Sequence, residues 1–387
     1  MKYIPYGRQD ISQADIQAVS DVLQSDWLTQ GPTIEQFEQK VAEYCGAKYA
    51  VAVNSATSAL HIACMVTGLG PDDRLWTSPN TFVASANCGR YCRATVDFVD
   101  IDIHTYNMSI DKLEQKLIIA KKQGKLPKVV IPVHFSGQSC EMDRIEILAE
   151  QYGFTVIEDA SHAIGGCYQD ERVGSCAYSD MTVFSFHPVK IVTTAEGGMV
   201  LTNKEELYEK LIQLRSHGIT RNPELMTEEG HGPWYYQQID LGYNYRMTDL
   251  QAALGLSQMN RLDEFVTRRQ AIAKKYNEEL QGLPIVLPWQ HPDTYSAYHL
   301  YVICLKKDKV EKTHKQVFEE LRQAGIGVNL HYIPVHTQPY YQQLGFDWGD
   351  FPISEFYYSA AISIPMYSAM TQTQQNDVIH AIKEVLS

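Results

Sequence analysis

The sequence contains no uninterrupted apolar run near the roughly 18 residues that a membrane-spanning helix needs. Its first residues, MKYIPYGRQD, contain no apolar stretch of the kind found in secretory signals. Basic residues are few, 33 Lys and Arg against 46 Asp and Glu, and the net charge of −13 disfavours a general binder of nucleic acids or anionic membranes. We therefore expect a cytoplasmic protein with no membrane or nucleic-acid partner, although a local basic site could still hold a phosphorylated ligand.

The eight cysteines of the 387-residue chain do not form the pattern of a disulfide framework. Cys64 in HIACMV and Cys304 in YVICLK lie in apolar contexts. Cys88 and Cys92 form a CxxxC without the second pair that would complete a zinc site. Free, mostly buried thiols and no metal centre are the expectation, which agrees with a reducing cytoplasm.

Strand-like and helix-like patterns alternate over the first half of the chain. Apolar strands are predicted at Tyr49–Val53, in TVDFVDI, in KVVIPVHF and in FTVIEDAS, and helical patterns at Ile34–Cys45, in ALHIACMVTG, in MSIDKLEQKLIIAKKQG and in EMDRIEILAEQYG. Continuously apolar strands are typical of a parallel sheet with helices on both faces. The pattern predicts a large three-layer α/β/α domain.

Two more strands, in DMTVFSFH and GGMVLTN, follow with no helix between them. Residues 218–241 are rich in Gly, Pro and Tyr and predict a long excursion loop. From Thr248 to Leu280 the pattern is helical, and YVICLK, a helix near Glu311–Gln323, GVNLHYI and a last helix alternate more loosely. We predict a large domain at 1–246 and a smaller α/β domain at 247–387.

The stretch NSATSAL follows the strand Tyr49–Val53 and begins a helix at about Thr57. A helix N-terminus offers free backbone N–H groups and a positive dipole end to an anion, and Thr57 and Ser58 add hydroxyl donors. Simple helix capping by Ser and Thr is the alternative interpretation.

In FTVIEDASH, Glu158 and Asp159 must point to opposite faces of the strand, because side chains alternate. A carboxylate at the end of an apolar strand needs a partner, for which a protonated nitrogen is suited, although Asp159 could merely cap the next turn. Asp159, Ser161 and His162 stand too close on one extended segment to form a hydrolase triad, and no GxSxG motif is present.

In SFHPVKIVTTAEGG, Lys190 is the only basic residue apart from His187 in an otherwise mostly uncharged stretch. Desolvation lowers the pKa of a lysine, and a neutral amine can form a Schiff base with an aldehyde. A structural lysine with its ammonium at the surface is the alternative. Together the three motifs supply an anion cradle, a carboxylate for a ring nitrogen and an amine, which are the three partners that pyridoxal 5′-phosphate requires.

Over nearly its whole length the chain resembles the DegT-type nucleotide-sugar aminotransferases. The resemblance rests on these motifs together with WLTQGPTIEQFE, EDASHAIG, TTAEGGM, LRSHG and LGYNYRMTDLQAALG. The resemblance implies the fold of fold-type-I pyridoxal-phosphate enzymes, with a mostly parallel central sheet. It implies that Lys190 and Asp159 are the catalytic residues: Lys190 binds the cofactor aldehyde, and Asp159 keeps its ring nitrogen protonated. Dehydratase relatives carry histidine in place of that lysine, so transamination is favoured over dehydration.

The resemblance also implies further cofactor contacts. Thr57, Ser58 and Ser185 are expected at the phosphate, Phe82 on one face of the ring, and His162 beside the cofactor where many relatives carry glutamine. Asn244 matches a residue that relatives extend to the phosphate of the neighbouring subunit, which implies a homodimer with shared sites. A core phenylalanine and a turn asparagine are the alternatives for Phe82 and Asn244.

The expected reaction moves an amino group from L-glutamate to the C4 keto carbon of a UDP-linked 4-keto-6-deoxy-N-acetylhexosamine, UDP-2-acetamido-2,6-dideoxy-β-L-arabino-hex-4-ulose. NSATSAL, TTAEGG, ALGLSQ and HYIPVH resemble the branch of the family that serves pseudaminic acid and surface glycan biosynthesis. Candidate substrate contacts are Thr29, Gln30, His331 and Tyr332. Arg246 is a candidate to bind the carboxylate of the amino donor, on its place in the fold alone. Another 4-keto or 3-keto nucleotide sugar, or a cofactor-sensing regulatory module, is the alternative, and the chain has no DNA-binding segment to support the latter.

Overall fold

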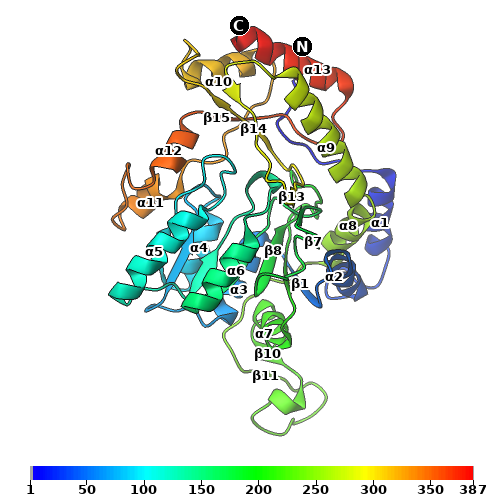
Figure 1. The fold of residues 1–387 in the computed structure, drawn as a ribbon. Coiled ribbons are helices and arrows are strands. Elements are labelled where there is room, and N and C mark those ends of the chain that lie inside the picture. Colours follow the sequence, from blue (N-terminus) through cyan, green and yellow to red (C-terminus); the bar gives the residue numbers. More distant parts are fainter. Residues whose placement is uncertain (1–2, 387) are drawn as a thin grey trace.

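The computed structural model describes residues 3–386, and a seven-stranded sheet forms the centre of its larger part (Figure 1). In spatial order the strands are β1 (Tyr49–Val53), β9 (Gly198–Thr202), β8 (Met181–Ser185), β5 (Thr155–Asp159), β4 (Val129–Ile131), β2 (Arg74–Thr77) and β3 (Thr95–Phe98). Strand β9 runs antiparallel to both its neighbours, and the other pairs are parallel. The predicted mostly parallel sheet is confirmed.

Helices cover both faces of this sheet (Figure 1). They are α2 (Pro32–Cys45), α3 (Ala56–Val66), α4 (Ala84–Tyr91), α5 (Ile110–Gln123), α6 (Met142–Tyr152) and α7 (Glu205–Arg215), while α1 (Gln13–Leu23) packs on α8 (Asp249–Met259). The sequence specifies their ends locally. For example, Pro32 occupies the first turn of α2, and Gly46 ends that helix with a φ of 80° that suits glycine.

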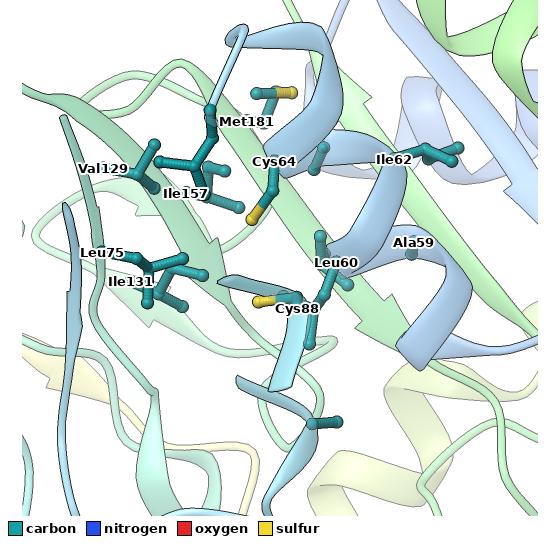
Figure 2. Packing of buried hydrophobic residues seen from close by; sticks show 14 of the residues in the cluster. Ala59, Leu60, Ile62, Cys64, Leu75, Cys88, Val129, Ile131, Ile157 and Met181 are labelled. Atoms are coloured by element: carbon teal, nitrogen blue, oxygen red, sulfur yellow. The ribbon is translucent and has the colours of Figure 1, made fainter. Parts of the chain in front are cut away.

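The two faces of the sheet bury separate apolar clusters. Ile157 of β5 packs with α3, α4 and α7, whereas its neighbour Val156 packs with α5 and α6 on the other face. Figure 2 shows part of the first cluster, with Leu60 and Cys64 of α3 beside the strands that carry Ile131 and Ile157. Because of this alternation, Glu158 and Asp159 at the end of β5 face opposite sides of the sheet.

A smaller antiparallel sheet organises the C-terminal part. Its strands are β12 (Ile285–Val286), β14 (Tyr301–Leu305) and β15 (Ala361–Ile364), and its helices are α9 (Leu262–Glu279), α10 (His314–Gln323) and α13 (Gln372–Leu386). Ile4 pairs with Ile326 and belongs to the same apolar cluster, so the N-terminal segment reaches across to the C-terminal part. The boundary near residue 246 stays a prediction.

Short elements complete the chain. They are β6 (Cys167–Tyr168), β7 (Glu171–Arg172), β10 (Ile219–Thr220), β11 (Gln237–Gln238), β13 (Thr294–Tyr295), α11 (Pro339–Gln342), α12 (Pro352–Tyr358), and the 3-10 turns η1 (Phe135–Gly137), η2 (Pro223–Leu225) and η3 (Val335–Thr337). Between β10 and β11 the predicted excursion projects away from the body of the molecule (Figure 1). GVNLHYI forms no strand, only a bridge from Asn329 to Ser363.

All eight cysteines are free and six of them are buried, in agreement with the sequence. Within residues 3–386, no helix has the length and apolarity to cross a membrane. The same residues contain no cluster of His, Cys, Asp and Glu suited to a metal ion.

Candidate active site

A cavity of about 610 Å³ lies at the carboxyl ends of β1, β5 and β8. In doubly wound folds this edge of the sheet is where ligands bind. Eight residues singled out from the sequence line it: Thr57, Phe82, Asp159, His162, Ser185, Lys190, His331 and Tyr332. The fold therefore brings together residues that lie up to 275 positions apart, from Thr57 to Tyr332.

Lys190 lies in the turn that follows β8, with its amine inside the cavity. Desolvation lowers the pKa of Lys190 to about 8, and the negative charge of Asp159 opposes part of that fall. A substantial fraction of the amine is therefore neutral near physiological pH, and a neutral amine is a nucleophile and a base.

Asp159 ends β5 and is 5% exposed. Its Oδ2 accepts a hydrogen bond from Ser85 Oγ at 2.6 Å, and its Oδ1 accepts one from the Ser161 backbone N–H at 3.1 Å. The carboxylate thus caps the following turn and also lines the cavity. Within the described residues no Lys or Arg side chain forms an ion pair with Asp159, so its charge is available to a protonated nitrogen of a ligand.

Glu158 points away from this cavity, as strand alternation predicts. It is buried, and its carboxylate accepts hydrogen bonds from Ser179 and Thr182 and pairs with His134 Nε2 at 2.5 Å. Burial alone would raise the pKa of Glu158, but the hydrogen bond and charge of His134 and the two hydroxyl groups lower it. The two neighbouring carboxylates therefore have separate environments, and only Asp159 serves the cavity.

The N-terminus of α3 lies against the cavity. Ser55 caps the helix by accepting a hydrogen bond from the Ser58 N–H at 3.1 Å. Ser55, Ala56 and Thr57 all line the cavity, which directs the helix end and its free N–H groups toward a ligand anion. Ser185 lines the same cavity.

Gly198 allows this close approach between β9 and the start of α3. A Cβ atom at Gly198 would lie 2.6 Å from the Ala56 backbone nitrogen and equally close to the Ser55 backbone. Such a contact is far shorter than ordinary van der Waals packing, so backbone proximity requires glycine at position 198, the second glycine of TTAEGG.

Other predicted residues lie elsewhere. Ser58 Oγ donates to Asn54 Oδ1 at 2.7 Å and is not in the cavity lining, where Ser55 stands in its place. Thr29 and Asn244 are exposed, outside the cavity. Gln30 and Arg246 line a separate pocket of about 290 Å³. Their proposed contacts stay predictions.

The structure also adds residues that no motif indicates. Tyr6 reaches the cavity because Ile4 is anchored to the C-terminal part, and His299 enters from the segment before β14. Neither residue belongs to a motif that the sequence analysis recognises. A signal was present only for His299, whose position in an apolar stretch next to Tyr298 and Leu300 is unusual for a polar side chain.

Comparisons with known proteins agree over the whole chain. A family model described as the DegT/DnrJ/EryC1/StrS aminotransferase family matches residues 9–383. The spore coat polysaccharide biosynthesis protein SpsC of Bacillus subtilis is 41% identical over 99% of this chain and 97% of its own length. The UDP-4-amino-4,6-dideoxy-N-acetyl-beta-L-altrosamine transaminase of Campylobacter jejuni is 38% identical over 95% of this chain and 93% of its own.

Among solved structures, Helicobacter pylori PseC, an aminotransferase involved in the biosynthesis of pseudoaminic acid, superimposes with a TM-score of 0.90 at 30% identity. That comparison covers 100% of this chain and 99% of the other. The likeness extends to both parts of the molecule and to the segments that form the cavity.

Proposed function

The chain belongs to the DegT/DnrJ/EryC1/StrS aminotransferase family, and on this premise we propose that it transfers an amino group from L-glutamate to the C4 keto carbon of a UDP-linked 4-keto-6-deoxy-N-acetylhexosamine. The coarser statement, that it is a pyridoxal-phosphate-dependent sugar aminotransferase, follows from the family and its named relatives. The observation that carries the proposal is that one cavity holds a lysine with a lowered pKa and a buried aspartate that forms no ion pair with any described Lys or Arg.

The residues of the cavity fit pyridoxal 5′-phosphate, which the family implies. The N-terminus of α3, with Thr57 and Ser185, suits a phosphate, and Asp159 suits a protonated pyridine nitrogen. Lys190 would bind the aldehyde, and Phe82, which is 58% exposed, offers a ring face to stack on. When bound, this cofactor supplies a carbonyl for amines and a conjugated ring that takes up an electron pair.

Lys190 carries the proton transfer. Its neutral Nζ removes the proton from the α-carbon of the amino donor and later returns a proton to the carbon that receives the amino group. The carboxylate of Asp159 would hold the ring nitrogen by a charge-assisted hydrogen bond. A pKa near 8 suits both directions, because an acid and a base form of the amine are then available in the working pH range.

Binding of the nucleotide sugar is assigned to the mouth of the cavity. Candidate contacts within the cavity are His331 and Tyr332, and Thr29 and Gln30 are candidates that lie outside it. Asn244 of a second copy completes the phosphate site in a homodimer. The named Campylobacter relative supports the altrosamine-type product, and the Bacillus relative supports a role in polysaccharide biosynthesis. A reducing, cytoplasmic setting agrees with the free thiols.

A different keto nucleotide sugar is the second candidate. The Bacillus subtilis relative SpsC, which is 41% identical, is named for spore coat polysaccharide and not for a particular sugar. The position and stereochemistry of the new amine distinguish these candidates.

The first test is spectroscopic. Purified protein loaded with pyridoxal 5′-phosphate should show the visible band of lysine-bound cofactor, and L-glutamate should remove it while 2-oxoglutarate appears. The aminated enzyme is then offered the UDP-linked 4-keto sugar, and NMR identifies the product. A band that never forms refutes the cofactor assignment, whereas glutamate turnover without reaction of this sugar refutes only the acceptor.

A further inference from the structure

The hydrogen bonds of His162 fix which ring nitrogen carries its proton. Nδ1 accepts a hydrogen bond from the backbone N–H of Ser136 at 3.2 Å, so Nδ1 must hold a lone pair. Burial, reinforced by the positive charge of Lys190, holds the pKa of His162 well below its usual range. The ring is therefore neutral, and its one hydrogen is on Nε2.

This hydrogen on Nε2 sets the direction of the next hydrogen bond. Tyr332 Oη lies 3.1 Å from His162 Nε2. Since Nε2 donates, the tyrosine oxygen accepts, and the phenolic hydrogen is left free. Burial and the negative charge of Asp159 raise the pKa of Tyr332, so the phenol keeps that hydrogen. Among the described residues the hydroxyl group has no other partner within hydrogen-bond distance.

The neighbouring His331 differs in this respect. Its Nδ1 lies 2.8 Å from Ser363 Oγ, and its Nε2 lies 3.4 Å from Asn329 Nδ2, an obligatory donor. Nε2 therefore accepts and Nδ1 donates to the serine, which uses both ring nitrogens. His331 lines the cavity without a hydrogen to donate into it, although the sequence predicts it and Tyr332 as equivalent substrate contacts.

Two groups of donors in the cavity already have roles. Lys190 is reserved for the cofactor aldehyde, and the hydroxyl groups at the N-terminus of α3 for the phosphate. Tyr332 lines the same cavity as Lys190, and its ring lies 6.2 Å from that of Phe82. Its free hydrogen is thus held at the side of the cavity that the C-terminal part contributes.

We infer that Tyr332 Oη donates a hydrogen bond to the keto oxygen of the substrate, and that neutral His162 is the positioning residue that orients it. This inference rests on the proposed function, because it requires a keto substrate at Lys190. A donor on the carbonyl oxygen makes the carbonyl carbon more electrophilic toward an amine, and it stabilises the negative charge that develops on that oxygen.

The direction of the hydrogen bond can be measured without cofactor or substrate. In apoprotein labelled with ¹⁵N-histidine, long-range ¹H–¹⁵N correlation spectra give the tautomer of each imidazole, and His162→Gln identifies the resonances. We expect His162 to be neutral with its hydrogen on Nε2 from neutral to mildly acidic pH. A neutral ring with its hydrogen on Nδ1 would overturn the inference, because Tyr332 would then donate to Nε2. A charged ring would contradict the neutral His162 on which the inference rests.

The kinetic test uses Tyr332→Phe, which removes the hydroxyl group and keeps the ring. Reaction of the aminated enzyme with keto substrates should slow about tenfold at saturation, the size expected for one lost hydrogen bond of about 1.4 kcal/mol. Exchange of the α-hydrogen of glutamate with D₂O, which needs Lys190 but no keto oxygen, should keep its rate. Equal slowing of both steps would indicate a structural role and overturn the inference.

Tyr340→Phe is the matched control. Tyr340 is 50% exposed, and within residues 3–386 its hydroxyl group accepts a hydrogen bond from Arg90 Nε alone, at 3.3 Å, so both rates should be unchanged. If the wild-type enzyme does not react with the UDP sugar, the proposed function fails at its acceptor. The reaction of the aminated enzyme is then measured with 2-oxoglutarate as the keto substrate, and the tautomer of His162 still decides the inference.

Discussion

Among single residues, Lys190 combines a nucleophilic amine with a position inside the cavity and a pKa near 8. Lys190→Ala should lower transamination by about 10³-fold or more, because the base and the covalent attachment point are lost together. The free energy of unfolding should change by less than about 1 kcal/mol, since no buried ion pair is broken. Turnover of both half-reactions and urea unfolding check this, and near-normal turnover would refute the assignment of Lys190.

The pH dependence of cofactor attachment is set by the protonation of the same residue, Lys190. The folded pKa of about 8 lies below that of a solvated lysine, about 10.4, so the neutral amine is the majority form above pH 8 and a steadily falling minority below it. The rate at which apoprotein takes up pyridoxal 5′-phosphate should rise with pH, reach half its maximum at about pH 8 and level off at higher pH. Stopped-flow absorbance measures it, and a midpoint near 10 would contradict the lowered pKa.

At this scale the sequence is informative where one residue type has one chemical use. Lys190 and Asp159 are recognisable because a lysine in an uncharged stretch and an acid at a strand end both need an explanation. The sequence does not distinguish the role of Ser55 from that of Ser58. Both are hydroxyl residues at a helix start, and only the folded backbone shows that Ser55 lines the cavity while Ser58 bonds to Asn54.

For the elements, the approach of β9 to the start of α3 makes the strongest prediction. Gly198→Ala would place a Cβ atom 2.6 Å from backbone atoms that cannot rotate away. The helix start must shift, which should cost about 1–3 kcal/mol of stability and weaken binding of the phosphate. Urea unfolding and the dissociation constant of pyridoxal 5′-phosphate measure the two effects.

Gly70→Ala serves as the control for that variant. A Cβ atom at Gly70 would have its nearest contact at 3.9 Å, and Gly70 does not have a left-handed φ. It should leave both quantities unchanged. If Gly198→Ala also left both unchanged, the close approach of β9 and α3 would not be what positions the anion site.

Long apolar elements are predictable from their periodicity, and shorter ones are not. The strand β1 and the helices α2 and α5 follow patterns that their own residues carry. The strand β2 has four residues, and α4, ASANCGRY, is mostly polar or small, so neither has a distinct pattern. GVNLHYI has strand-forming residues, but its backbone turns into the cavity after a single bridge to Ser363.

For the whole molecule, the least predictable feature is the connection between the N-terminal segment and the C-terminal part. Ile4 N–H donates to Gly325 O at 2.9 Å, Gly327 N–H donates to Ile4 O at 2.7 Å, and Met366 N–H donates to Tyr6 O at 2.9 Å. These partners lie more than 300 positions apart, and no local pattern encodes such pairing. A boundary drawn along the sequence therefore assigns this segment to the large domain, although it packs with the small one.

This connection predicts a coupling between stability and substrate binding. Ile4 is 2% exposed within the C-terminal apolar cluster, and two residues later Tyr6 lines the cavity. Ile4→Ala should cost about 2–4 kcal/mol in urea unfolding and raise the KM for the sugar severalfold. The visible band of the bound cofactor should be unchanged, because the groups that hold it come from the large sheet.

Ile16→Ala, at an isoleucine that is 51% exposed, should change neither the unfolding free energy nor the KM. A destabilised Ile4→Ala enzyme with unchanged KM would show that the segment serves folding alone, and that Tyr6 keeps its position in the cavity without it.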